Sequence, residues 1–276
     1  MTASDAESAP PFLVAASLSG ASDADWARAA APHVDAAVLG GIALDPASRA
    51  AARDLVARDR SEFLPEDPLA WIARQLDRLA DDSLRPGVNV RSATVDPVRE
   101  AAEICAERGA VCEVNAHCRQ PELRAVGCGE SLLRDADRLA EYVSAAAETG
   151  ATTSVKVRAE VPDVDLVAVA DAVADAGADW LHVDAMDSEA VVQELTAGRT
   201  TGEAERPRDG LTVIANNGVR GRATVAEYAA YGADAVSVGR PSERPPALSR
   251  VADAVAVWRK GQLLAAGDAD PPEAPP

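Results

Sequence analysis

The residues best suited to chemistry gather in one loop. A short apolar run at residues 111–114 predicts a strand, and a helical pattern starts near Ser131. Between them lie Asn115, His117 and Cys118. Loops that leave a strand and carry reactive side chains on a rigid scaffold are frequent sites of function. We therefore expect this segment to form part of an active site.

Cys118 is the candidate for proton transfer. Its positive neighbours, His117 and Arg119, favour a thiol that delivers a proton or reacts as a thiolate. The structural alternative is an inert cysteine in a loop.

Lys156 stands out because the chain contains only two lysines, Lys156 and Lys260. It lies in the alternating run 154–158, which predicts a strand. A lysine fixed there could hold an electron-rich ligand or form a Schiff base. The structural alternative is an ion pair with Glu113 or Asp184.

Glycines follow the last two predicted strands. Gly218 follows the run 211–215, and Gly239 and Arg240 follow the run 235–238. In parallel barrels the loops after the seventh and eighth strands often bind phosphate through backbone N–H groups. These residues together predict a phosphate-bearing ligand.

The elements that position these residues alternate regularly, as eight pairs of an apolar run and a helical pattern. The predicted strands are residues 12–16, 36–39, 88–90, 111–114, 154–158, 180–184, 211–215 and 235–238. The predicted helices are residues 23–31, 48–80 with breaks near Pro65 and Pro68, 96–108, 131–148, 164–176, 188–195, 224–231 and 248–264. Eight such pairs favour an α/β fold of the parallel (β/α)₈ type, the TIM barrel, over an open doubly wound sheet.

We expect a single barrel domain at residues 11–265. Residues 1–10 and 266–276 are rich in proline, alanine and acids, which predicts disordered tails. A polar, arginine-rich insertion is expected at residues 197–209.

The alternation of side chains along a strand predicts which residues face the barrel interior. In the run 154–158 the valines must face the helices, so Lys156 and Arg158 point inward. The same test on three other strands selects Asn89, Arg91, Glu113, Asn115, His182 and Asp184. Such polar groups are costly to bury without a ligand or partner. We expect Arg91, Glu113, His117, Arg158, His182 and Asp184 at the substrate.

The composition says more about the solvent than about the partner. The net charge is −18, from 45 acidic and 27 basic residues, and arginine provides nearly all of the positive charge. An acid-rich, lysine-poor chain is typical of proteins that work in very high salt, where self-repulsion is screened. The acidic charge therefore does not exclude a nucleic-acid substrate.

The four cysteines are expected to be reduced thiols in a cytoplasmic protein. The chain opens without a signal-peptide pattern and has no apolar run of the roughly 20 residues that span a membrane. It also lacks a C-x-x-C pair, so we expect no metal site. The cysteines are Cys105, Cys112, Cys118 and Cys128.

Several segments resemble the tRNA-dihydrouridine synthases. The run NAHC and the later GCGESLL, within residues 115–133, resemble the Asn-x-x-Cys and Gly-x-Gly-x-x-Leu-Leu of that family's strand-four loop. FLVAASLSGASD, SVKVR, IANNGV and GADAVSVGR resemble its first, fifth, seventh and eighth strands. The resemblance covers roughly residues 12–240. It extends to the wider flavin barrels that include dihydroorotate and dihydropyrimidine dehydrogenases.

The resemblance implies an FMN-dependent oxidoreductase that acts on a pyrimidine ring, with NAD(P)H as the electron donor and tRNA or a small pyrimidine as the substrate. Cys118 matches the family's proton donor. Lys156 would lie near the N1–C2=O edge of the flavin. The other residues expected at the cofactor are Ala16, Asn89, Asn115, Asn217, Gly218, Gly239 and Arg240.

Three features depart from the family pattern. The strand-six Val-His-x-Arg reads Val-Asp-Ala-Met at residues 183–186, so its histidine and arginine are absent. The first-strand Pro-Met, which flanks the flavin, reads Ala16-Ser17. The chain also ends soon after the last predicted helix, where the family carries a helical domain for tRNA.

Dihydrouridine synthesis is the leading hypothesis because the cysteine loop is the best match. The main alternative is a small-molecule flavin oxidoreductase of the dihydroorotate or dihydropyrimidine type, which a missing helical domain favours. Two further alternatives are a flavin-free TIM-barrel lyase that uses Lys156 and Asp184, and a non-catalytic protein that binds a phosphate ligand.

Overall fold

Eight parallel strands form a closed barrel in which neighbours in sequence are neighbours in space and β8 pairs with β1. The computed structural model describes residues 12–185, 187–197 and 210–263. The strands are β1 (Phe12–Ala15), β2 (Ala36–Ala43), β3 (Arg85–Arg91), β4 (Val111–Asn115), β5 (Thr152–Arg158), β6 (Trp180–Asp184), β7 (Thr212–Asn216) and β8 (Ala235–Val238). The prediction of a TIM barrel is confirmed, and the open sheet was the wrong alternative. The predicted tails and nearly all of the predicted insertion lie outside the described residues.

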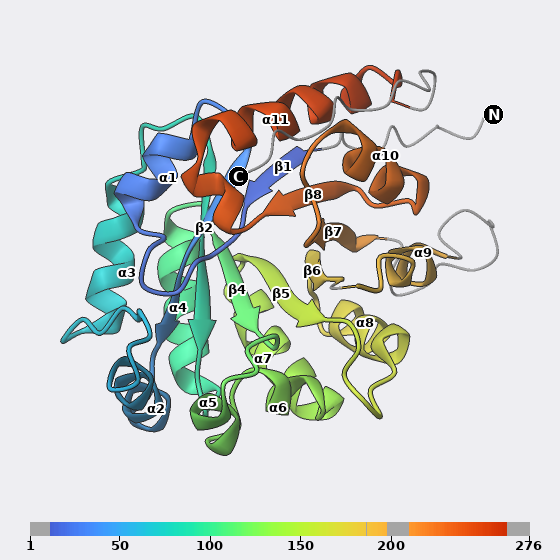
Figure 1. Cartoon of the computed structure of the whole chain (residues 1–276). Helices are drawn as coiled ribbons and strands as arrows, with labels where there is room; N and C mark the ends of the chain where they lie inside the picture. Colours follow the sequence, from blue (N-terminus) through green and yellow to red (C-terminus); the bar gives the residue numbers. More distant parts are fainter. Residues whose placement is uncertain (1–11, 186, 198–209, 264–276) are drawn as a thin grey trace, which may run out of the picture.

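Helices surround the strands, and the chain colours in Figure 1 run around the ring from blue to red. The helices are α1 (Ala24–Ala30), α2 (Pro46–Val56), α3 (Pro68–Asp77), α4 (Asp96–Glu107), α5 (Pro121–Ala125), α6 (Glu130–Leu133), α7 (Ala136–Ala147), α8 (Leu166–Asp175), α9 (Val191–Thr196), α10 (Arg222–Ala230), the 3₁₀ helix η2 (Arg240–Glu243) and α11 (Pro245–Arg259). In the described part of the chain, no helix is both long and apolar enough to cross a membrane.

Aspartates begin five of these helices. Each accepts a hydrogen bond from a backbone N–H of the first turn, which would otherwise lack a partner. Proline also occupies the first turn of several helices, where its missing N–H costs nothing. The capping residues are Asp23, Asp45, Asp67, Asp135 and Asp165.

The main hydrophobic core lies between the strands and the helices. Val155 and Val157 of β5 are fully buried in this layer, as the alternation along the strand predicted. Lys156, between them, therefore faces the barrel interior. The bottom of the interior holds a separate apolar cluster that includes Val14, Trp180 and Ile214. Polar side chains occupy the interior above it.

The structure departs from the predicted boundaries at two places near the mouth. β2 continues to Ala43, beyond the predicted end at Leu39, because Gly41 leaves room for polar side chains of β3. A Cβ at Gly41 would lie 2.5 Å from Asn89 Oδ1 and 3.0 Å from Arg91 Nε. The predicted helix 131–148 is divided into α6 and α7 where Asp135 begins the new helix.

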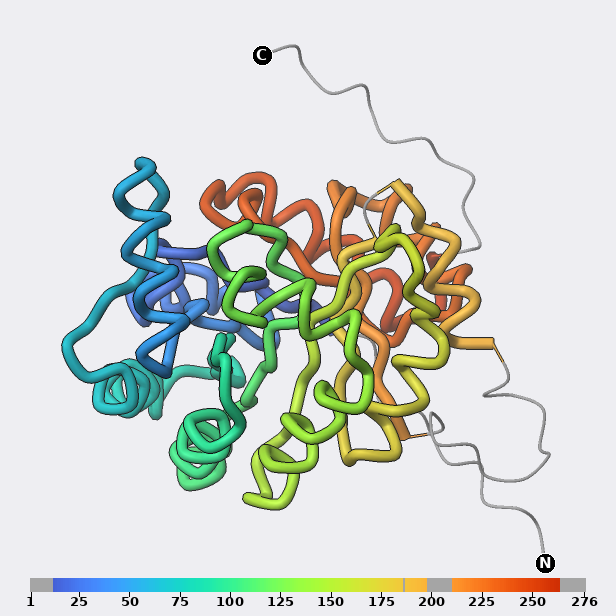
Figure 2. Tube along the Cα trace, turned by 90° about the horizontal axis from the view of Figure 1, so that it is seen from below, coloured from blue at the N-terminus to red at the C-terminus, as the bar shows by residue number. Residues whose placement is uncertain are grey.

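The segment after β4 forms a small compact unit rather than an open loop. Helix α5 and the turn after it pack against α2, with Leu123 and Cys128 on one side and Ala51 and Leu55 on the other. Figure 2 shows α2 and the green segment after β4 on the same, upper side of the barrel. This packing fixes the segment over the mouth.

Aspartates close the opposite end of the barrel. Asp35, Asp179 and Asp234 each precede an even-numbered strand and accept a backbone N–H from the preceding strand, at 2.7–2.8 Å. For Asp179 the donor is Thr153 of β5, a fully buried residue. These contacts fix the strand register from which the mouth residues project.

Asp179→Ala should therefore lower the free energy of unfolding by about 1–3 kcal/mol, because it leaves the buried Thr153 N–H without its acceptor. Denaturant titration measures the change. Asp175→Ala is the matched control at an exposed end of α8, and it should leave the midpoint unchanged. Equal effects of the two changes would show that the contact does not support the strand.

Candidate active site

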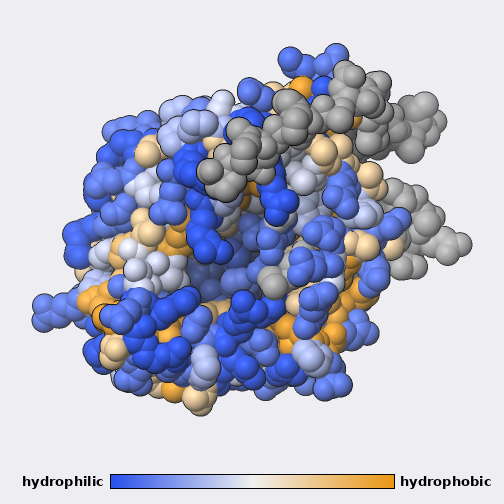
Figure 3. All heavy atoms as spheres, in the orientation of Figure 1, coloured by the Kyte–Doolittle hydropathy of each residue, from blue (hydrophilic) through white to orange (hydrophobic). Residues whose placement is uncertain are grey.

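The carboxyl ends of the strands surround a hollow with two connected parts, of about 430 and 440 Å³. Figure 3 shows hydrophilic residues gathered around a depression on this face. Six residues line both parts: Ser17, His117, Lys156, Asp184, Asn217 and Arg240. The loops after β1, β4 and β7 and the ends of β5, β6 and β8 thus meet at one place.

The mouth is cationic although the whole chain is acidic. The first part of the hollow is lined by six basic side chains, Arg60, Arg91, Arg119, Lys156, Arg158 and Arg240, but by only two acidic ones, Glu62 and Asp184. A concave site with one dominant sign of charge concentrates ligands of the opposite sign. The hollow therefore suits an anionic ligand.

A buried carboxylate organises the barrel interior beneath this hollow. Glu113 is fully buried and accepts hydrogen bonds from Asn89 Nδ2 at 2.8 Å, Ser154 Oγ at 3.1 Å and His182 Nδ1 at 2.7 Å. Burial alone would raise the pKa of Glu113. The interaction with His182, the charge of Lys156 and the hydrogen bond from Asn89 outweigh burial and bring the pKa to about 2.

The protonation of His182 follows from this carboxylate. Burial and the charge of Lys156 lower the pKa of His182, so its ring is neutral. Its Nδ1–H donates to Glu113, which leaves Nε2 to accept from Ser237 Oγ at 2.7 Å. Ser237 Oγ in turn accepts from Asn216 Nδ2 at 2.6 Å. The donors and acceptors of four strands are thus fixed by one charge.

The same network sets the orientation of Asn115 at the start of the loop. Asn115 Nδ2 donates to Asn89 Oδ1 at 2.8 Å, so Asn115 Oδ1 faces the loop. That oxygen accepts the backbone N–H groups of His117 at 3.2 Å and Cys118 at 3.0 Å. The position of Cys118 therefore depends on Glu113 through two amide side chains.

Glycine secures the loop from its other side. The carbonyl oxygen of Cys118 accepts the backbone N–H of Glu130 at 2.9 Å. Gly129 has φ of +61°, and a Cβ there would overlap that carbonyl oxygen. Only glycine combines this φ with so close an approach. The loop that holds Cys118 is therefore fixed at both ends.

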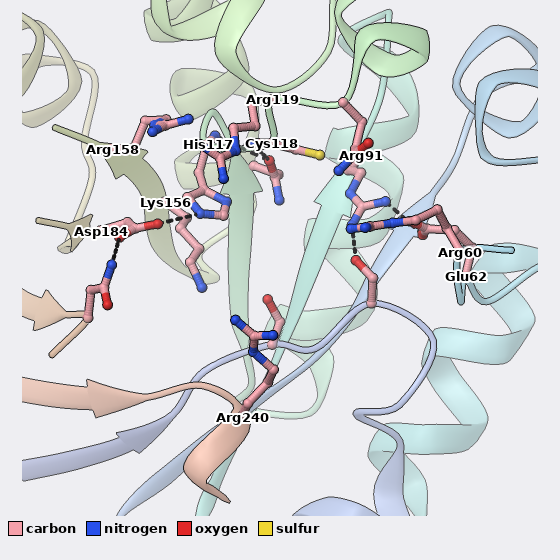
Figure 4. A pocket seen from close by; sticks show the side chains of 15 residues that line it. Arg60, Glu62, Arg91, His117, Cys118, Arg119, Lys156, Arg158, Asp184 and Arg240 are labelled. Atoms are coloured by element: carbon pink, nitrogen blue, oxygen red, sulfur yellow. Dashed lines mark hydrogen bonds and ion pairs between the residues drawn. The ribbon is translucent and has the colours of Figure 1, made fainter. Parts of the chain in front are cut away.

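Lys156 projects into the hollow (Figure 4). Its side chain is 4% exposed and makes no hydrogen bond or ion pair with any described residue. Burial lowers the pKa of Lys156, while the carboxylates of Glu113 and Asp184 oppose that shift. The structure therefore does not support the alternative in which Lys156 is held in a direct ion pair.

Arg91 forms the wall of the hollow beside Cys118. Its guanidinium is held by Glu62 at 2.7 Å and by the Ser19 hydroxyl, and its Nε has no partner among the described residues. Burial opposes the charge of Arg91, but nearby Cys118 and the ion pair with Glu62 outweigh burial and raise the pKa of Arg91. Figure 4 shows the Cys118 sulfur directed toward this arginine.

His117 and Asn217 form a second set of hydrogen bonds at the hollow, both with Asp184. Its Nε2 lies 2.8 Å from Asp184 Oδ2, and Asn217 Nδ2 donates to Asp184 Oδ1 at 3.1 Å. Burial would raise the pKa of Asp184, but the His117 and Asn217 hydrogen bonds and Lys156 bring it to about 2. Burial and Lys156 lower the pKa of His117.

The ends of β7 and β8 form the second part of the hollow. Arg220, Arg240 and Arg244 line it together with Gly218 and Gly239. A Cβ at Gly239 would meet no atom closer than 3.8 Å, and one at Gly218 none closer than 3.6 Å. The backbone here lies among three arginines, which suits a phosphate group.

Most residues expected at a ligand from the sequence do line the hollow. They are Ala16, Arg91, Asn115, His117, Cys118, Lys156, Arg158, Asp184, Asn217, Gly218, Gly239 and Arg240. Asn89, Glu113 and His182 lie below its floor and are fully buried. Their expected contact with cofactor or substrate stays a prediction, and their visible contacts are with other mouth residues.

Sequence reasoning did not select several residues of the site. Arg60 and Glu62 come from the segment between α2 and α3, and no periodicity relates that segment to the mouth. Ser154 and Ser237, in contrast, face inward by the same alternation that selected Lys156, so the test could have found them. Within the described residues, no cluster of histidine, cysteine and carboxylate side chains could hold a metal ion.

Comparison with known proteins identifies the family. The family model for dihydrouridine synthase (Dus) matches residues 61–263, which include Cys118 and Lys156. The chain belongs to the dihydrouridine synthase family. An uncharacterized protein of Methanocaldococcus jannaschii is 30% identical over 175 residues, which are 62% of this chain and 67% of that protein.

Solved structures share the barrel at low identity. The 3-hexulose-6-phosphate synthase of Salmonella typhimurium superposes with a TM-score of 0.53 and 15% identity, over 91% of this chain and 99% of that one. A putative lyase/mutase of Burkholderia cenocepacia J2315 gives 0.54 and 17%, over 90% and 80%. These similarities show the fold alone.

The resemblance of the strand-four loop to the family pattern has a structural reason in this chain. Asn115 holds the backbone of the cysteine, and Gly129 allows the return of the chain against it. The family's strand-six histidine is replaced by Asp184, whose carboxylate contacts His117.

Glu113→Gln should lower the free energy of unfolding by about 1–3 kcal/mol, because a carboxamide cannot accept from all three of its donors and leaves Lys156 without a full counter-charge. Glu148→Gln, at an exposed ion pair with Arg99, is the control. Denaturant titration of both variants tests this; losses of equal size would contradict an organising role for Glu113.

Iodoacetamide should modify the folded protein at Cys118 alone. Cys105, Cys112 and Cys128 are buried, and burial raises the pKa of Cys128 to about 12. Intact-mass analysis should show one adduct in the native protein and four after unfolding. Native modification of Cys128 at a rate comparable to Cys118 would be evidence against the loop packing described above.

Proposed function

We propose that this protein is an FMN-dependent oxidoreductase that reduces a uracil ring to dihydrouracil, with uridine in tRNA as its substrate. Membership of the dihydrouridine synthase family supports this reaction. The observation that carries the proposal is that one cationic hollow brings together the pocket-facing thiol of Cys118 and the buried amine of Lys156, which has no hydrogen-bond partner among the described residues.

The residues of the hollow fit FMN in two respects. Arg220, Arg240 and Arg244 lie at the ends of β7 and β8, where barrels commonly hold phosphate. Lys156 offers a cation without a hydrogen-bonding partner in the described chain, at the centre of the mouth. A cation there suits the ring edge that gains negative charge on reduction.

The chemistry is divided between the cofactor and the chain. When bound, FMN would supply the electron pair, as hydride to one carbon of the pyrimidine C5=C6 bond, with NAD(P)H restoring the electrons. Cys118 gives its Sγ–H proton to the other carbon, so that the double bond gains one hydride and one proton. The thiolate that remains faces Arg91, and solvent returns its proton. Lys156 holds the electron-rich edge of the cofactor in place.

The cationic rim supports a substrate that carries phosphate. Arg60, Arg119 and Arg158 line the part of the hollow that includes Cys118. Arg220 and Arg244 line the other part, at the ends of β7 and β8. An RNA backbone would place phosphates on either side of the reacting base, where arginine forks bind them. The acid-rich, lysine-poor composition leads us to propose that the protein works in high salt in the cytoplasm.

The test compares Cys118→Ala with Cys128→Ala, in protein loaded with FMN in multimolar salt. Proton delivery contributes about 10²–10⁴-fold in rate. Pre-reduced Cys118→Ala should therefore keep its flavin but reoxidise at least about 10²-fold more slowly with tRNA from a strain deleted for this protein. Cys128→Ala should stay near the wild-type rate. Flavin absorbance without oxygen follows the reaction.

Three outcomes would contradict the proposal. Failure of the protein to bind added FMN would contradict the proposal that it is a flavin enzyme. Equal rates for the two variants would show that Cys118 is not the proton donor. Reoxidation by free uracil and not by tRNA would assign the protein to the small-molecule alternative.

A further inference from the structure

Many of the side chains that line the hollow are hydrogen-bond donors only. They are its five arginines and Lys156. A uracil ring presents two carbonyl acceptors with one N–H between them. The carbonyls can be met by the basic side chains, but the N–H needs an acceptor from the protein.

Several acceptors of the mouth already have partners. Asn115 Oδ1 accepts two backbone N–H groups, and Asn217 Oδ1 accepts the N–H of Gly218 at 2.8 Å. Both carboxylate oxygens of Asp184 accept hydrogen bonds, from His117 and from Asn217. These oxygens are therefore engaged within the protein.

His117 differs from them because its contacts leave one ring nitrogen available. Asp184 is ionised and can only accept, so a neutral His117 must carry its proton on Nε2 and donate it. Nδ1 then bears a lone pair. It makes no hydrogen bond within the described chain, and the side chain is 32% exposed at the hollow, next to Cys118.

We propose that His117 Nδ1 accepts the imide N–H of the pyrimidine substrate and thereby selects uracil-type rings over cytosine. This inference deepens the proposed function and rests on its pyrimidine substrate. Lys156 and Arg158, from the adjacent β5, supply donors beside the histidine (Figure 4). Together they match the acceptor–donor–acceptor edge of uracil.

The arrangement excludes cytosine by the same geometry. Cytosine carries an acceptor at N3, which would face the lone pair of Nδ1. It also carries an amino group where uracil has a carbonyl, and that group would face a basic side chain. Sites built to hydrogen-bond a particular N–H discriminate strongly against analogues that lack it, because the protein group is left unpaired.

Asp184 is the positioning residue, because it sets the tautomer of His117. In Asp184→Asn the amide oxygen can keep the hydrogen bond from Asn217, and the amide N–H₂ then faces His117. The ring must accept at Nε2 and carry its proton on Nδ1. Replacing one carboxylate oxygen by an amide NH₂ group thus converts His117 Nδ1 from an acceptor into a donor, while the side chains keep their shape.

Nitrogen-15 NMR of the histidine rings tests the tautomer without any substrate. The chain has three histidines, so the spectrum can be assigned with single variants. We expect His117 as the Nε2–H form and His182 as the Nδ1–H form, and Asp184→Asn should convert His117 alone. A charged His117, or one with Nδ1–H in the wild type, would overturn the inference.

Equilibrium binding tests the recognition separately from the chemistry. The probes are UMP, N3-methyl-UMP and CMP, added to the FMN-loaded protein. Wild type and the control variant His33→Gln, in the turn after α1 and outside the lining of the hollow, should bind UMP about tenfold or more tightly than either analogue. Asp184→Asn and His117→Ala should lose this preference.

The two proposals fail in different ways. Binding of UMP with the expected preference, but without reduction, would contradict the proposed function and leave the role of His117 intact. Reduction of uridine with an unchanged preference in Asp184→Asn and His117→Ala would contradict the role of His117 alone. Absence of UMP binding by the wild type would also count against this inference.

Discussion

The carboxylate of Glu113 is the interaction on which the mouth of this barrel depends. A buried charge is costly unless hydrogen bonds and an opposite charge compensate it. Here three side-chain donors and nearby Lys156 do so. Since an ionised carboxylate can only accept, every donor that reaches it is fixed in direction. Glu113 orients Asn89, Asn89 orients Asn115, and Asn115 binds the backbone of Cys118. The charge of Glu113 thus determines the position of the Cys118 thiol.

The polar interior and the apolar layers have separate tasks. Helix-facing side chains and the apolar cluster at the bottom of the barrel provide the packing that makes the fold stable. The upper interior gives up such packing for hydrogen bonds and charge, as functional sites commonly do. Its basic rim opposes the acidic charge of the chain. The mouth therefore retains attraction for an anion although the whole chain is acidic.

The strand-four loop and strand six are coupled through His117 and Asp184. The family pattern places a histidine on strand six, and this chain has an aspartate there. The aspartate contacts a histidine that the neighbouring loop supplies. An imidazole thus reaches the mouth from the loop after β4, two strands from β6, because all strands of the parallel barrel end at the same face. A match made position by position along the sequence cannot reveal such an exchange.

The sequence by itself determined the barrel, the inward face of its strands and the loop that carries Cys118. These follow from local rules, since alternation decides which face a side chain takes and eight strand–helix pairs favour closure. It also singled out Lys156 by its rarity. The tertiary structure decided what these rules cannot reach. Arg60 and Glu62 join the site from a distant segment, and Glu113 and His182 lie beneath the hollow, because such contacts depend on how separate elements pack and not on spacing along the chain.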